Sequence, residues 1–189
     1  MHRERRVSNL PRTIAFAAAL TAGVAPLAAP AGAPPKVAVL PLAAADSGMP
    51  YGLLPSRSEL SIMTSQLRAG LSAGHVVLVG QKRLPAALSS AGFDQTSPER
   101  SCVVAECARR FGRAVGADEV LVGAVTRGMA VIWGTSFSLV DVRSGKVVSA
   151  MSVGYKGDVQ AMELGERDAG TCLARVIGHR PPCPPDPGW

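Results

Sequence analysis

The sequence predicts a mixed α/β fold, an α+β sandwich in which helices pack on a single mixed sheet of about five strands. Three observations predict it. Short apolar runs of strand length alternate with segments of helical periodicity through the first part of the chain. Three strands joined by short turns then follow, a pattern typical of an antiparallel meander. The length left after a leader segment, about 155 residues, suits one domain.

Residues 1–33 have the three parts of a secretory signal peptide. Four arginines precede a run of small apolar residues, and A-x-A cleavage sites follow at 29–31 and 31–33. Cleavage after Ala31 is favoured because Pro34 directly follows the second site. The alternative is an uncleaved anchor, but the run is rich in Ala, Gly and Pro rather than Leu and Ile. We therefore expect a periplasmic or secreted protein with no stable membrane span after cleavage.

The charge of the mature chain argues against a nucleic-acid partner. The full chain carries a net charge of +6, and removing residues 1–33 removes four Arg and one Glu, which leaves 16 − 13 = +3. Aromatic residues make up only 4% of the chain, so few side chains are available to stack on bases. The apparent basicity is therefore largely a property of the leader.

The first half of the domain predicts two strands and two helices. Residues 37–42 form a short apolar run expected to be a buried strand, in which Pro41 indicates an early end or an edge position. Apolar residues at helical spacing predict a helix over 58–73. A second strand over 75–80 and a short helix over 81–92 follow.

The second half predicts one more helix before the meander and one after it. The helix after the first cysteines ends at Gly116. The three strands are expected over 119–128, 130–146 and 147–157, and the last helix covers 158–177. The domain therefore covers 34–178, and a proline-rich tail covers 179–189.

Two side-chain patterns refine this second half. Alternation along the middle strand places Trp133, Phe137 and Leu139 on the core face, and Asp158 is the expected N-cap of the last helix. Glu163, Glu166 and Asp168 lie close together on that helix with Arg167 among them, which we interpret as a solvated charged face.

The segments "KVAVLPL", "CVVAECARRFGRAVGADEVLVGAVTR" and "LVDVRSGKVVSAMSV" resemble a known group of proteins. The chain is similar over about residues 36–157 to exported bacterial proteins of unknown function, relatives of the TolB N-terminal domain and of CsgG-like envelope lipoproteins. The resemblance implies a non-enzymatic part of an envelope assembly and carries over no catalytic residue. This sequence lacks the propeller repeats of TolB and the lipid-accepting cysteine of CsgG-like proteins.

The four cysteines, Cys102, Cys107, Cys172 and Cys183, favour disulfides in an exported chain. Two residues five apart on one continuous helix lie about 7.5 Å apart along its axis and about 140° around it. Their Cα atoms are then more than the roughly 7 Å apart that a bridge allows. Cys102 can therefore bond Cys107 only if Cys102 precedes the regular helix, and Cys172 with Cys183 then clasps the tail to the last helix. A metal site or redox-active thiols are the alternatives.

No other motif carries chemistry. The sequence has no paired-histidine metal motif, no G-x-S-x-G turn and no phosphate-binding loop, so it predicts no catalytic, cofactor-binding or metal residue. Arg109, Arg110 and Arg113 form a basic helix edge that is a possible partner surface, with a solvated face as the alternative.

We therefore expect a non-enzymatic, secreted or periplasmic binding or assembly module with no cofactor. Its expected partner is an unknown envelope protein or cell-wall component. The alternatives are an envelope thiol or redox protein using Cys102 and Cys107, and a domain that senses a small ligand in a pocket beside Trp133.

Overall fold

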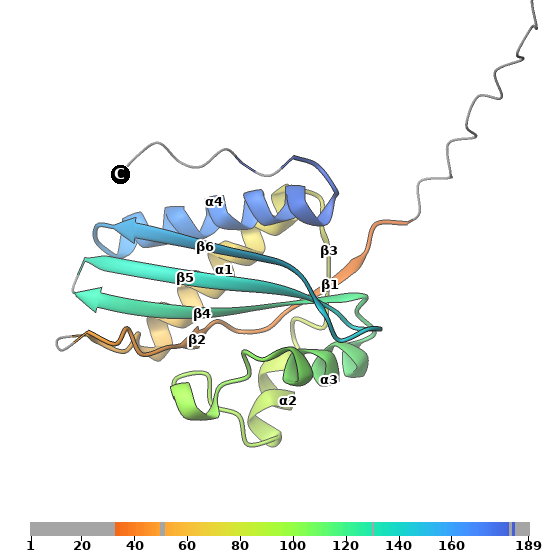
Figure 1. The fold of residues 1–189 in the computed structure, drawn as a ribbon, viewed down its shortest axis with the longest axis horizontal. Helices are drawn as coiled ribbons and strands as arrows, with labels where there is room; N and C mark the ends of the chain where they lie inside the picture. The colour runs from red at the N-terminus through yellow and green to blue at the C-terminus, as the bar shows by residue number, and fades with distance from the viewer. Residues whose placement is uncertain (1–32, 50–51, 130, 182, 184–189) are drawn as a thin grey trace, which may run out of the picture. The chain divides into compact units, whose positions relative to one another are not determined.

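The computed structural model describes residues 33–49, 52–129, 131–181 and 183, which form one open mixed sheet with helices packed on both faces (Figure 1). The mixed α/β class is thereby confirmed. The expected signal peptide lies outside the described residues except for Ala33, as does most of the expected proline-rich tail.

The sheet has a parallel part and an antiparallel part. Its strands are β1 Lys36–Val39, β2 Ala43–Ala44, β3 Val77–Val79, β4 Glu119–Met129, β5 Ile132–Asp141 and β6 Val147–Lys156. They lie in the order β3-β1-β4-β5-β6, with β2 also paired to β4. Strand β1 pairs in parallel with β3 and β4, whereas β4, β5 and β6 form the expected antiparallel meander.

The helices occupy both sides of this sheet. They are α1 Arg57–Ala73, α2 Leu84–Ser90, the 3-10 helix η1 Pro98–Arg100, α3 Ala105–Val115 and α4 Val159–Ile177. Strand β1 is interior rather than at an edge, so of the two alternatives raised by Pro41 the early end is correct. Its alternate residues are buried on both faces, as expected for a parallel strand between two neighbours.

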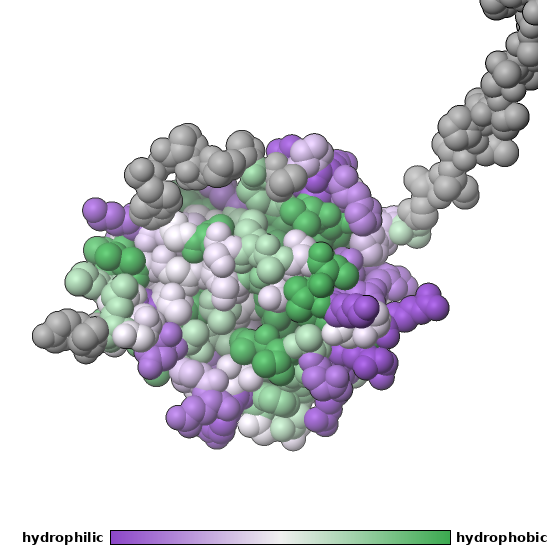
Figure 2. Space-filling view, in the orientation of Figure 1, coloured by the Kyte–Doolittle hydropathy of each residue, from purple (hydrophilic) through white to green (hydrophobic). Residues whose placement is uncertain are grey.

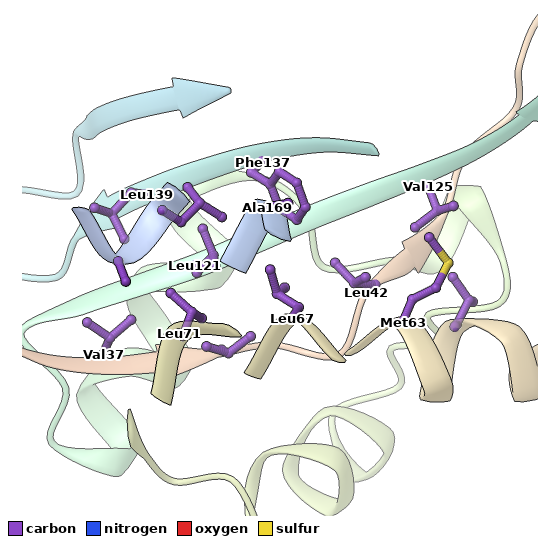
Figure 3. Close-up of a cluster of buried hydrophobic side chains, with 14 of the residues drawn as sticks. Val37, Leu42, Met63, Leu67, Leu71, Leu121, Val125, Phe137, Leu139 and Ala169 are labelled. Carbon is purple, nitrogen blue, oxygen red and sulfur yellow. The ribbon is translucent and has the colours of Figure 1, made fainter. Parts of the chain in front are cut away.

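Two hydrophobic clusters lie on opposite faces of the sheet. Helices α1 and α4 cover one face, where Met63, Leu67 and Leu71 pack against Val37 and Phe137 (Figure 3). Helices α2 and α3 cover the other face over the parallel strands, where Phe111 is buried and its ring packs edge-on against Phe93. The expected core face of β5 is confirmed, because its alternate residues are buried on the side of α1 and α4.

Helices α1 and α4 touch through glycines. A Cβ atom at Gly70 would overlap the backbone of Arg167 on α4, and one at Gly170 would overlap the backbone of Leu67 on α1. The absence of side chains at both positions therefore allows the two helix backbones to approach closely.

The start of α1 is fixed both locally and to the sheet. Ser56 and Glu59 form a reciprocal capping box, in which the Ser56 N–H donates to Glu59 Oε2 at 2.7 Å. The other Glu59 oxygen accepts from Arg127 on β4 at 3.0 Å, and that guanidinium lies 4.5 Å from the ring centre of the buried Trp133. The Glu59 carboxylate therefore takes part both in the N-terminal cap of α1 and in an ion pair with β4.

One part of the sheet has no helix over it among the residues that the structure describes. Opposite α1 and α4, α3 covers only the Val140 end of β5, and no described helix covers the rest of β5 or β6. Figures 1 and 2 view the molecule from this side, where much of the surface has pale, weakly hydropathic colours. None of the ten residues of β6 is buried. Its outward side chains are small over the central stretch, with Ala150, Ser152 and Gly154 at alternate positions.

Candidate functional site

A cleft of about 490 Å³ lies beside the carboxyl end of β1. Pro41 and Leu42, which lie two and three residues after the end of β1, form one part of its lining, α1 forms a second and residues 92–100 form a third. Strand β1 is where the parallel strand order reverses, because the chain leaves it through α1 to β3 on one side and later returns to β4 on the other. In open α/β sheets, the crevice outside the carboxyl end of such a strand is the usual place for a ligand.

The α1 wall of the cleft is polar. Ser61, Ser65 and Arg68 are spaced by four and three residues, so they lie along one face of the helix. Arg68 is half-buried, and its Nη2 donates to the carbonyl of Val39 at 2.9 Å, which anchors the guanidinium at the end of β1. Burial lowers the pKa of Arg68 from its ordinary value. No acidic side chain among the described residues forms an ion pair with it.

The opposite wall is held together by its own polar contacts. Asp94 accepts from Thr96 Oγ1 at 2.6 Å and from Arg100 at 3.2 Å, and these contacts lower the pKa of its carboxyl, with Thr96 the largest cause. Gln95 Nε2 donates to the Pro41 carbonyl at 2.7 Å, and its Oε1 accepts from the Cys102 N–H at 2.8 Å. Gln95 therefore fastens the wall to the segment that follows β1.

A disulfide lies directly behind this wall. Cys102 and Cys107 are bridged with a Cα–Cα distance of 5.7 Å, and α3 begins only at Ala105, so Cys102 lies outside the regular helix as the bridge requires. Cys172 and Cys183 form the second bridge, with Cα atoms 5.4 Å apart. All four cysteines are therefore disulfide-bonded, and none is a free thiol.

The three arginines of the expected partner surface lie on α3, away from the cleft, and they differ from one another. Arg109 is half-buried and donates to the carbonyls of Val142 and Arg143, both at 3.3 Å, so its guanidinium holds the β5–β6 turn. Arg110 and Arg113 are exposed. The partner surface stays a prediction.

The expected solvated face of α4 is wrong at Glu166, which is fully buried between α4 and the sheet. Its Oε1 accepts a 2.5 Å hydrogen bond from Thr135 on β5, while its Oε2 has no hydrogen-bond partner among the described residues. Burial raises the pKa of this carboxyl to about 7, and the Thr135 bond opposes that rise. The feature of the sequence that indicates this burial is the spacing. Glu166 lies four residues after Met162 and seven before Leu173, on the buried stripe of α4.

The cleft itself was missed at the level of sequence. Periodicity identified the apolar side of α1, but the polar stripe of Ser61, Ser65 and Arg68 on the next face was not singled out. Trp133 is buried against α1 and Arg127 and does not line the cleft, so the expected pocket beside its face is not where the cleft lies.

Within the described part of the chain, no helix combines the length and apolar character needed to cross a membrane. The same residues bring together no group of three or more side chains suited to holding a metal ion.

Three solved structures of bacterial proteins are similar to this chain. Lipoprotein GNA1162 from Neisseria meningitidis is 18% identical, with 77% of this chain and 96% of that chain covered and a TM-score of 0.50. The LpoB C-terminal domain from Salmonella enterica is 22% identical over 66% and 84% of the two chains, with a TM-score of 0.48. The PelC dodecamer from Paraburkholderia phytofirmans is 20% identical over 75% and 83%, with a TM-score of 0.41. At these identities the likeness to GNA1162 supports a shared fold alone.

Comparison with curated proteins finds no significant match. The relation to TolB and CsgG-like proteins stays a prediction, because neither is among the similarities described above. Residues 35–162 match the family DUF3280, described as a protein of unknown function (DUF2380). That match spans the sheet, α1 to α3 and the first turn of α4. The chain therefore belongs to this family.

Proposed function

We propose that residues 34–178 form a non-enzymatic, periplasmic or secreted module of the cell envelope that binds a partner protein through the edge of β6 with which no described strand pairs. Residues 1–33 act as its secretory signal peptide, and residues 179–189 form a proline-rich tail. The observation that carries the proposal is the exposure of β6, an edge strand of ten residues of which none is buried.

An exposed edge strand offers unpaired N–H and C=O groups to another extended chain. Natural proteins commonly block such edges with prolines or charges, yet β6 contains no proline and its one charged residue, Lys156, is at its end. The small outward residues Ala150, Ser152 and Gly154 leave the strand accessible over its centre. The edge is therefore suited to the addition of a strand from a partner.

Charge favours a different protein over a second copy of this chain. Antiparallel pairing of β6 with itself in the register centred on Met151 would place Lys146, the residue before β6, opposite Lys156 of the other copy. Like charges directly opposite one another destabilise strand pairing. An extended segment with acidic residues at its ends fits the same edge without this repulsion.

The two alternative functions, a thiol or redox role and the sensing of a small ligand, have different support. A thiol or redox role would need a cysteine that is not structural, and all four cysteines form disulfides. A role in binding a small ligand needs a cavity, which the cleft beside Arg68 supplies, and it is compatible with partner binding at β6.

The test uses a photo-crosslinking amino acid at Ala150 on β6 and, as a control, at the exposed Arg175 on α4. In cells that export the protein, we expect a covalent adduct with a distinct envelope protein from position 150 and none from 175. With that partner added, backbone amides of β6 should gain protection from hydrogen exchange. Adducts of two copies of this chain, or an unchanged exchange pattern in β6, would refute the proposal.

A further inference from the structure

We propose that the cleft beside β1 binds a small organic anion, whose charged group pairs with Arg68 and whose apolar body lies against Leu60, Leu88 and Phe93. This site is separate from the β6 edge and does not depend on the proposed partner. The wall of this cleft holds a half-buried cation, Arg68, that has no counter-ion among the described residues.

Arg68 is the residue that requires explanation. Removing a cation from water is costly unless an anion or hydrogen-bond acceptors replace the water. Arg68 has one such acceptor, the Val39 carbonyl, and its Nε atom is buried without a hydrogen-bond partner among the described residues. A ligand anion in the cleft would supply the missing charge.

The other two cations of the cleft share one carboxylate, that of Asp94. Arg100 contacts the Asp94 carboxylate at 3.2 Å, and Arg57 lies 3.9 Å from it at the exposed rim. The three arginines and one aspartate of the lining leave the cleft with an excess of positive charge. Arg68 is therefore the one arginine of the described lining that has no carboxylate beside it.

The shape and composition of the cleft define the rest of the ligand. Its volume of about 490 Å³ suits a small molecule rather than a single inorganic ion. Leu60 and Leu88 come from α1 and α2, and Phe93 comes from the facing loop, so the apolar surface converges from three segments. Gln95 and the Cys102–Cys107 bridge hold that loop in place before a ligand arrives.

The probe is 8-anilinonaphthalene-1-sulfonate, a fluorescent anion with an aromatic body, titrated into protein purified after export. N-phenyl-1-naphthylamine, which lacks the sulfonate, is the neutral counterpart. We expect saturable binding of the anion, with octanoate or octyl phosphate competing better than octanol. Stronger competition by octanoate would identify the anionic group as a carboxylate. Stronger competition by octyl phosphate would identify it as a phosphate ester.

Arg68→Met keeps an unbranched apolar stem and should weaken binding of the anionic probe about tenfold, while the neutral probe changes less than about twofold. Ser65→Glu places a carboxylate one helical turn from Arg68 and should weaken binding similarly without removing the cation. Arg110→Met, which removes an exposed charge from α3, is the matched control and should bind as the parent protein does.

Thermal unfolding of each variant separates loss of binding from loss of the fold. If Arg68→Met unfolds, Ser65→Glu still tests the site, because Ser65 is exposed. Unchanged affinity of the anionic probe in folded Arg68→Met or in Ser65→Glu would overturn the proposal. So would competition by octanol equal to that of both anions.

Discussion

Replacing Glu166 with Gln should remove a pH dependence from the stability of the protein. Glu166 is fully buried on α4, and burial raises the pKa of its carboxyl from 4.5 to about 7. The substitution keeps the size of the side chain and an oxygen that accepts from Thr135. It removes only the ability to take a negative charge.

The direction of the pH dependence follows from the number of protons that the folded and the unfolded protein hold. Below pH 4.5 the carboxyl is protonated in both the folded and the unfolded protein, so its contribution to the free energy of unfolding is fully present. Between pH 4.5 and about 7 the folded protein keeps a proton that the unfolded chain releases, so the free energy of unfolding falls as pH rises. Above about pH 7 the loss is complete.

The magnitude follows from the same two values. Each tenfold difference in proton affinity is worth about 1.4 kcal/mol, so a rise from 4.5 to about 7 corresponds to a loss of about 3 kcal/mol. Urea unfolding followed by circular dichroism, at pH values from 4.5 to 8, measures it. The parent protein should lose about this amount across the range, and Glu166→Gln should lose correspondingly less.

The comparison must isolate Glu166 from other titrating groups. Burial also raises the pKa of Glu119, which contributes in the same direction in both proteins and cancels in their difference. Tyr155 on β6 has a pKa raised by burial and by the nearby charge of Glu166, and it titrates above this range. Asp168→Asn, an exposed change on the same helix, is the control. Equal pH slopes in the parent protein and Glu166→Gln would refute the reasoning.

Two further predictions concern the helices and the first disulfide. Gly170→Ala should lower the free energy of unfolding by about 1–3 kcal/mol despite the helix propensity of Ala, because the new Cβ overlaps the Leu67 backbone. Thr171→Ala, at an exposed neighbour, should change it by less than about 0.5 kcal/mol in the same denaturant titration, and similar losses in both would count against close packing. Changing Cys102 and Cys107 together to Ser should cost about 2 kcal/mol and speed hydrogen exchange in residues 92–104, whereas unchanged exchange there would contradict the role of the bridge.

The local features of the fold could be predicted because their causes are local. Alternation along β5 identified its core face, and Asp158 caps α4 as its type and position suggest, accepting from the Gln160 and Ala161 N–H groups at 3.0 Å. The condition on the first disulfide followed from helix geometry alone, since Cys102 must precede α3.

The features that were missed depend on contacts between distant segments. Nothing near residues 37–42 determines that β3 and β4 flank them on both sides. Glu166 was assigned to solvent by its residue type, although its spacing placed it on the buried stripe of α4. The cleft arises where α1 meets residues 92–100, and Asp94, Gln95 and Arg68 come together only in the tertiary structure.

The contact between Arg127 and Trp133 gives the protein a built-in optical reporter. The indole is 2% exposed and lies under a guanidinium that the Glu59 carboxylate holds in place. Glu59 also caps α1, whose next residues, Leu60 and Ser61, line the cleft. Any movement of the first turn of α1 therefore changes the electric field and polarity at the indole. The emission of Trp133 should thus register a ligand in a cleft that the indole itself does not touch.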